Sequence, residues 1–231
     1  MAKAAQAAKK AFDLVFLGNS VLRRTSLPVD VGAITKPETK ELMAGMRKVL
    51  ASTEYGIGLA APQVGHNVRM LLYLNIVEND LTEEGTERDS LDHFPPPIMM
   101  INPVITDRSV EMVNEWEQCL SVPEFTGLVP RHASVSVDYY DEDGVARSVN
   151  MKGQDARTVQ HEIDHLDGVL FIDRVDLKTN LFVTKEYERI LAENPREIVQ
   201  HEYPDIDFSD VGLSSSAPEG VDFTSDTQRD N

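Results

Sequence analysis

The chain has 231 residues, of which 41% are hydrophobic and 26% charged, and its formal net charge is −17. This acidity argues against binding to bulk nucleic acid, and no apolar run approaches the roughly 20 residues that a membrane helix needs. The single cysteine, Cys119, excludes an intramolecular disulfide and fits a reducing compartment.

The first part of the chain contains one region that is typical of a helix. Residues 1–11 hold three lysines and no acid, and we expect them to form a flexible N-terminus. Residues 35–53 place apolar side chains at helical spacing, with acids near the start and bases near the end, which predicts an amphipathic helix. Short apolar or alternating runs then predict strands at 68–74, 98–105, 133–140 and 145–151, with a hairpin turn at 142–144.

Two segments differ from the rest in composition. Residues 78–97 carry seven acids, one arginine and three consecutive prolines, and we expect a loop insertion there. Residues 180–193 have helical spacing, whereas 201–231 are acidic and poor in apolar residues, which predicts a disordered tail. The expected folded part is therefore one domain over 12–200.

The segment TVQHEIDHLDG at 158–168 contains the pattern H-E-x-x-H. On a helix, His161 and His165 share a face, so they can offer two nitrogens to one metal ion. Glu162 lies at the edge of that face, where it can act as a general base on water without being a ligand. Apolar residues cover much of the segment, which predicts a buried helix. We expect an α+β fold, with mixed or antiparallel sheets packed around this central helix and further helices near each end.

A catalytic metal site usually has three protein ligands and one open position, so a third ligand is needed. The metzincin pattern would place a histidine at 171, but this chain has Phe171, and Gly168 is better explained as a helix C-cap. The other candidates are Cys119 and, as in a thermolysin-like peptidase, a later glutamate: Glu186, Glu188 or Glu193.

Three segments, in this order along the chain, resemble the signature motifs of peptide deformylases. GIGLAAPQ (56–63) matches G-x-G-x-A-A-x-Q, EQCLS (117–121) is similar to E-G-C-L-S, and QHEIDHLDG (160–168) contains H-E-x-x-H. LVPR (128–131) also resembles the family, and the resemblance spans about 14–175. The chain is thus identified as a divergent member, with Gln118 where the family has glycine.

The resemblance implies an enzyme that removes the formyl group from N-terminal N-formylmethionine. It implies that Cys119, His161 and His165 bind one divalent metal ion, natively Fe(II), with Zn(II), Ni(II) or Co(II) as alternatives. It further implies Glu162 as the catalytic acid and base. It also implies catalytic roles for the side-chain amide of Gln63 and the backbone N–H of Leu120, which would stabilise charge on the formyl oxygen.

The resemblance also implies substrate-binding positions, namely Ile57, Gly58, Glu117 and Gln118. Our hypothesis is that the side chain of Gln118 narrows or polarises the pocket. Gln154 and Asp155 stand where the family more often has apolar residues lining the methionine pocket. These departures concern substrate preference and leave the catalytic set complete.

The expected partners are N-formylmethionyl nascent peptides, with transient ribosome association and neither bulk nucleic acid nor membrane. Two alternatives stay open: an H-E-x-x-H metallopeptidase, and a degenerate protein that binds formylated N-termini without turnover. For location we expect the mitochondrion or another organelle if the source is eukaryotic, and the cytoplasm if it is bacterial.

Overall fold

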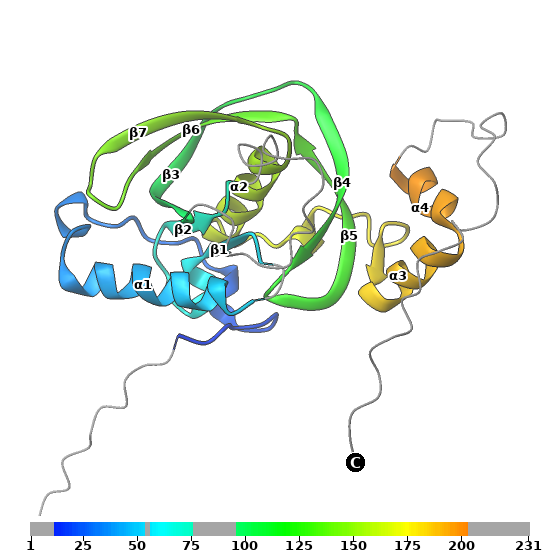
Figure 1. The fold of residues 1–231 in the computed structure, drawn as a ribbon, viewed down its shortest axis with the longest axis horizontal. Coiled ribbons are helices and arrows are strands. Elements are labelled where there is room, and N and C mark those ends of the chain that lie inside the picture. The colour runs from blue at the N-terminus through cyan, green and yellow to red at the C-terminus, as the bar shows by residue number, and fades with distance from the viewer. Residues whose placement is uncertain (1–11, 54–55, 76–95, 203–231) are drawn as a thin grey trace, which may run out of the picture.

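The computed structural model describes residues 12–53, 56–75 and 96–202 (Figure 1). The expected flexible N-terminus at 1–11, nearly all of the insertion at 78–97 and the tail from 203 onwards lie outside the described residues. None of the helices in the described part combines the length and the apolar character that crossing a bilayer requires.

The larger sheet has five antiparallel strands in the order β1-β2-β3-β6-β7. Its strands are β1 Gly58–Ala60, β2 Met70–Tyr73, β3 Ile98–Arg108, β6 Ser134–Tyr140 and β7 Ala146–Lys152. The four predicted strands are confirmed as β2, β3, β6 and β7. The predicted hairpin turn is also confirmed, with Gly144 at a φ of +79° and its N–H donating to the Asp141 carbonyl.

A second sheet has three antiparallel strands in the order β4-β5-β8, which the sequence did not predict. Its strands are β4 Met112–Cys119, β5 Val122–His132 and β8 Leu181–Val183. Strand β8 occupies the start of the region 180–193, so the helix prediction was wrong for those first residues. Helix α3, Thr184–Glu193, fills the rest of that region.

The other α-helices are α1 Pro37–Ala51, α2 Gly153–Leu166 and α4 Pro195–Glu202, and short 3-10 turns lie at Ser20–Arg23, Val31–Ala33, Ala61–Val64 and Phe171–Asp173. Helix α1 confirms the predicted amphipathic helix. It begins with Pro37, whose fixed φ and missing N–H suit a first turn, and it buries Leu42, Met46 and Leu50 in a core shared with β2.

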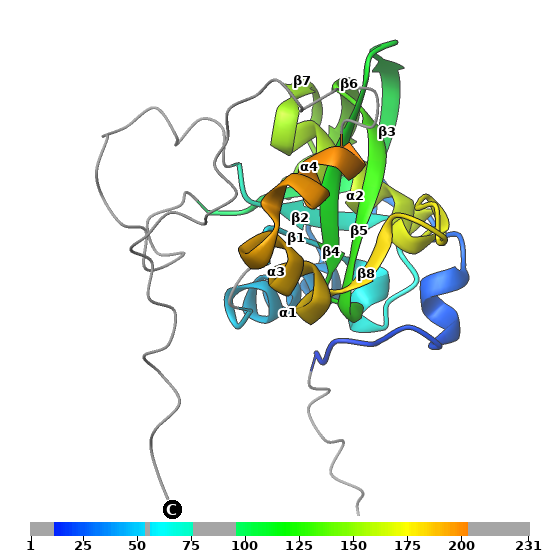
Figure 2. The same cartoon turned by 90° about the vertical axis from the view of Figure 1, so that its right-hand side faces the viewer.

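Helix α2 is central, and every residue from 155 to 166 is buried. Its apolar residues Ala156, Val159 and Ile163 pack in one cluster with strands of the five-stranded sheet. Figure 1 shows α2 enclosed by strands of both sheets, and Figure 2 shows α3 and α4 lying outside β4 and β5. The predicted C-cap is confirmed, because Gly168 has a φ of +77°, the left-handed region in which glycine is favoured.

Candidate metal and active site

The end of strand β4 and the buried helix α2 bring three candidate ligands together. One ligand atom from each of Cys119, His161 and His165 lies within 4.8 Å of the others. Cys119 Sγ is 3.3 Å from His165 Nε2. The three residues are 7%, 9% and 1% exposed, so the cluster is almost closed to bulk water.

This cluster fits a transition-metal ion. A thiol and two imidazoles suit iron, zinc, nickel or cobalt, whereas magnesium and calcium require oxygen ligands. Nothing else in the described part of the chain offers the Cys119 sulfur a strong partner, since the nearest donor besides the rings is Gln63 Nε2 at 3.7 Å. Three protein ligands with the cluster facing a cleft is the arrangement of a catalytic site rather than a four-coordinate structural one.

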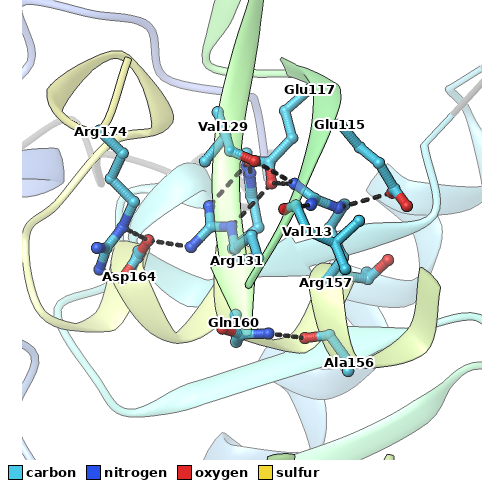
Figure 3. A network of polar contacts seen from close by, with 12 residues as sticks. Val113, Glu115, Glu117, Val129, Arg131, Ala156, Arg157, Gln160, Asp164 and Arg174 are labelled. Atoms are coloured by element: carbon cyan, nitrogen blue, oxygen red, sulfur yellow. Dashed lines mark hydrogen bonds and ion pairs between the residues drawn. The ribbon is translucent and has the colours of Figure 1, made fainter. Parts of the chain in front are cut away.

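The carboxylate of Glu117 orients the first candidate histidine ligand. Glu117 Oε2 lies 2.9 Å from His161 Nδ1, which leaves Nε2 of that ring for a metal. Arg131 donates to both oxygens of Glu117 at 2.8 Å, and Arg157 donates to Oε1 at 2.7 Å (Figure 3). Burial alone would raise the pKa of Glu117, but the hydrogen bonds from Arg131 and His161 hold it well below its ordinary value. The residue is therefore a carboxylate that positions His161. It also lines the cleft, so its predicted contact with the substrate stays a prediction.

A second carboxylate extends this network along α2. Asp164 accepts from Arg131 at 2.5 Å and from Arg174 at 2.5 Å, so Arg131 bridges Asp164 and Glu117 (Figure 3). Arg157 additionally pairs with Glu115 at 2.7 Å. Sequence reasoning assigned no role to these arginines or to Asp164. The only signal was the position of Arg131 in LVPR. The role of Arg131 depends on the packing of β5 beside α2, which a local motif does not reveal.

Glu162 is buried beside the cluster with one oxygen unsatisfied. It is 4% exposed, and its Oε2 has no hydrogen-bond partner among the described residues. Burial raises the pKa of Glu162 to about 7, although His161 and Arg131 nearby partly oppose the shift. A carboxyl group with such a pKa can take up and release a proton near neutral pH.

Gly58 makes room for this carboxyl group. A β-carbon at position 58 would lie 2.4 Å from Glu162 Oε1 and 2.9 Å from its carboxyl carbon. The resemblance assigned Gly58 to close approach of the substrate. The structure shows that the absent side chain also gives space to Glu162 itself.

Gln63 is buried, at 1% exposed, rather than an ordinary surface amide. Its Oε1 accepts from the Ala60 N–H at 2.7 Å, which turns the amide nitrogen towards Cys119. Ile57, Gln63 and Leu120 line a cleft of about 940 Å³ that also reaches His161 and Glu162. The cleft thus brings the predicted oxyanion-stabilising groups and the candidate ligands onto one surface.

The residues that depart from the family pattern differ in whether they line the cleft. Gln118 is exposed at the cleft, where its Nε2 donates to Thr126 Oγ1 at 3.0 Å. Gln154 also lines the cleft, whereas Asp155 is buried and is not among the lining residues. Of this pair, only Gln154 is placed to contact a substrate side chain.

The later glutamates are not part of the cluster. Glu186 and Glu193 lie on the exposed side of α3 and pair with Arg189. Among the described residues, Cys119 lies close enough to His161 and His165 to share one metal ion, and none of these glutamates does. The geometry therefore disagrees with the thermolysin-like alternative.

An N-terminal strap, residues 15–26, holds the three motif segments to one another. Each contact is a backbone hydrogen bond to a motif segment or its flank: Val15 N–H to Gln63 O at 2.8 Å, Leu17 N–H to Ser121 O at 2.8 Å, and Ser26 N–H to Leu166 O at 2.7 Å. The strap also passes close to Gly168, where a β-carbon would lie 2.9 Å from the Arg23 carbonyl carbon.

Comparison with known proteins identifies the family to which the chain belongs. The family model described as polypeptide deformylase matches residues 11–180. The chain belongs to the peptide deformylase family. It is 35% identical over 185 residues to peptide deformylase 2 of Nostoc sp., covering 79% of this chain and 96% of that protein. It is 37% identical over 179 residues to a peptide deformylase of Mesorhizobium japonicum, covering 77% and 91%.

Solved deformylase structures share the fold. The peptide deformylase of Synechococcus elongatus in complex with actinonin matches with a TM-score of 0.62 and 36% identity, over 74% of this chain and 84% of that one. The Met-Ala-Ser-bound class I type b peptide deformylase of Acinetobacter baumannii matches with a TM-score of 0.61 and 30% identity, over 71% and 98%. These relatives support peptide deformylase activity for the chain.

Proposed function

We propose that the chain hydrolyses the formyl group from the N-terminal formylmethionine of newly made polypeptides, using one divalent metal ion held by Cys119, His161 and His165. The observation that carries the proposal is the gathering of these three ligands within 4.8 Å beside a Glu162 oxygen that has no partner among the described residues. The family match and the deformylase relatives support the same reaction.

The ligand set suits Fe(II) as the native ion, with Zn(II), Ni(II) and Co(II) as substitutes. When bound, such an ion supplies a Lewis acid and lowers the pKa of water, so that a nucleophile is available at neutral pH. Glu117 fixes the ring of His161 for this role through the hydrogen bond to Nδ1.

Glu162 moves the proton. It accepts a proton from the attacking water and then gives it to the amine as the bond between formyl carbon and nitrogen breaks. Formate and the free N-terminus are the products. The amide nitrogen of Gln63 and the N–H of Leu120 would stabilise the charge that develops on the formyl oxygen, a donor being typically worth about 3–4 kcal/mol.

Two observations weigh against the alternatives. A peptidase with a carboxylate third ligand is disfavoured because Cys119 fills that place. A binder of formylated N-termini without turnover has no use for a general base, yet Glu162 is kept buried at an energetic cost beside the ligands.

The test is an anaerobic formate-release assay on formyl-Met-Ala-Ser, with Fe(II) supplied to the full chain. We expect turnover by the parent and loss of turnover with Glu162→Ala, while both proteins retain equal metal content. Absence of formate release by the metal-loaded parent would overturn the proposed reaction. Release that is unchanged in the Glu162→Ala variant would overturn the role of Glu162 alone.

Ribosome association and an organellar location stay predictions. The relatives described above are bacterial, which fits a cytoplasmic location for a bacterial deformylase.

A further inference from the structure

The C-terminal segment β8–α3 lies beyond the family match, which ends at residue 180, yet it forms a wall of the active-site cleft. Four of its residues line the cleft, Val183, Thr184, Lys185 and Tyr187. The same cleft also reaches His161 and Glu162. A peptide whose N-terminal end is held at those residues therefore lies in the same cavity as this wall.

Packing fixes the wall to the three-stranded sheet. Strand β8 pairs with β5, with Phe182 opposite Thr126 in an antiparallel register. The ring of Trp116 on β4 lies 5.4 Å from that of Phe182 and 4.8 Å from that of Tyr187, between ring centroids. Such aromatic contacts, together with the strand pairing, keep the start of α3 in one place.

A chain of hydrogen bonds ties the wall to the metal-ligand strand. Gln118 Nε2 donates to Thr126 Oγ1 at 3.0 Å, and Thr126 Oγ1 lies 2.9 Å from Thr184 Oγ1. Thr126 is buried, at 1% exposed, and Gln118 directly precedes Cys119. The glutamine that departs from the family motif thus connects the ligand strand to the first residue of α3.

Lys185 is an exposed basic residue in the lining of this cleft. The other basic residue with a permanent charge in the lining, Arg157, is buried and already pairs with Glu115 and Glu117. Lys185 is exposed and makes no ion pair among the described residues, in a chain whose net charge is −17. Three carboxylates also line the cleft: Glu117 is paired with Arg131 and Arg157, Glu162 is buried, and Glu124 is exposed. Lys185 is therefore the exposed positive charge that this lining offers to a substrate side chain.

We propose that the β8–α3 wall is a subsite for the residues that follow the formylated one, and that Lys185 favours an acidic side chain there. The proposal rests on the proposed function, because the direction of the peptide follows from the formyl group being held at Glu162. It assigns Lys185 a role in substrate selection and none in the chemical step.

The test compares peptides that differ only in one charge. A formyl-Met peptide carries aspartate or lysine at its second, third or fourth position, and the ratio of kcat/KM for the acidic and basic forms is measured for each position. The variants are Lys185→Glu and, as a matched control, Lys40→Glu, which makes the same charge change at an exposed site on α1 outside the cleft lining. The control removes the effect of the overall charge from the comparison.

Binding provides a second readout that does not need turnover. Trp116 is the single tryptophan of the chain and lines the cleft, so its fluorescence reports binding of the deformylated Met peptides with the same charge series. Exposed charge pairs change affinity by about two- to fivefold.

We expect Lys185→Glu to lower the acidic-to-basic ratio at least about threefold at one position or more, in kcat/KM and in binding, whereas Lys40→Glu leaves it near that of the parent. Equal ratios in the two variants at all three positions would overturn the subsite. If no peptide is turned over, the proposed function fails, and the fluorescence ratios still decide the assignment of Lys185.

Discussion

Replacing Gly58 by alanine tests whether this glycine is required by the Glu162 carboxyl group. An added β-carbon would lie 2.4 Å from Glu162 Oε1, and an ordinary contact begins at 3.4 Å, so the oxygen must move by about 1 Å. The Glu162 carboxyl has an oxygen without a partner in the described structure, so mainly packing opposes that movement. The variant should therefore fold, with a stability loss of about 1–3 kcal/mol from overpacking.

Activity should fall much further than stability. A displacement of about 1 Å in a group that transfers a proton costs on the order of 100-fold in rate, so we expect kcat for formate release to drop by about that factor. The matched control is Gly32→Ala, whose β-carbon would meet nothing closer than 3.7 Å. It should leave kcat unchanged.

A double-mutant cycle separates this cause from simple blockage of the substrate. Glu162→Asp shortens the side chain by one methylene and withdraws the carboxyl group from position 58. Although Glu162→Asp will itself be slow, adding Gly58→Ala to it should cost far less than adding it to the parent. An equal cost in both backgrounds, or a change in KM alone, would refute the steric explanation.

Further predictions concern the metal ligands, the buried carboxyls and the cleft. Cys119→Ser should lose bound metal, measured by elemental analysis, and a variant that kept its metal would revive a carboxylate-ligand peptidase. Glu117→Gln should weaken metal affinity by about 10- to 100-fold in a competition titration, because His161 loses its orienting carboxylate; unchanged affinity would argue against that role. In the metal-free protein, the pKa of Glu162 is raised from 4.5 to about 7, so folding favours the protonated form and stability falls as pH rises between these values. In urea unfolding of the metal-free proteins, Glu162→Gln should be about 3 kcal/mol more stable than the parent at pH 8 and about equally stable near pH 4. A stability difference that does not change with pH would contradict the raised pKa of Glu162. Gln118→Gly should change KM for formyl-Met peptides more than kcat, and unaltered constants would remove Gln118 from substrate selection.

The helix that carries the two histidines was predictable because its information is local. The spacing of His161 and His165, the apolar pattern around them and Gly168 at the end all lie within one segment, and helical periodicity determines which side chains share a face. The strands at 98–105 and 133–140 were predictable for the same reason. Cys119 was different, because only the resemblance selected it from the candidates for the third ligand.

Strands β4 and β5 were missed for a physical reason. Strand β5 contains Pro123, Gly127 and Pro130, which argue against a strand. Both prolines are tolerated because β8 covers β5 only at 125–127, so elsewhere one side of β5 has no strand partner among the described residues. The roles of Arg131 and Arg157 depend on this sheet, because charged side chains are normally exposed. Glu117 on β4 pairs with Arg131 on β5 and with Arg157 on α2, and Asp164 and Glu115 add further partners.

The N-terminal strap is synthesised before the three segments that it binds. Its donors meet carbonyls at residues 63, 121 and 166, so the strap can engage its last partner only after about three quarters of the polypeptide has been made. A protease that cut just after residue 26 would leave every proposed catalytic side chain in the molecule. It would nevertheless separate the strap from the rest of the chain, and with it the backbone hydrogen bonds that hold together the three segments carrying those side chains.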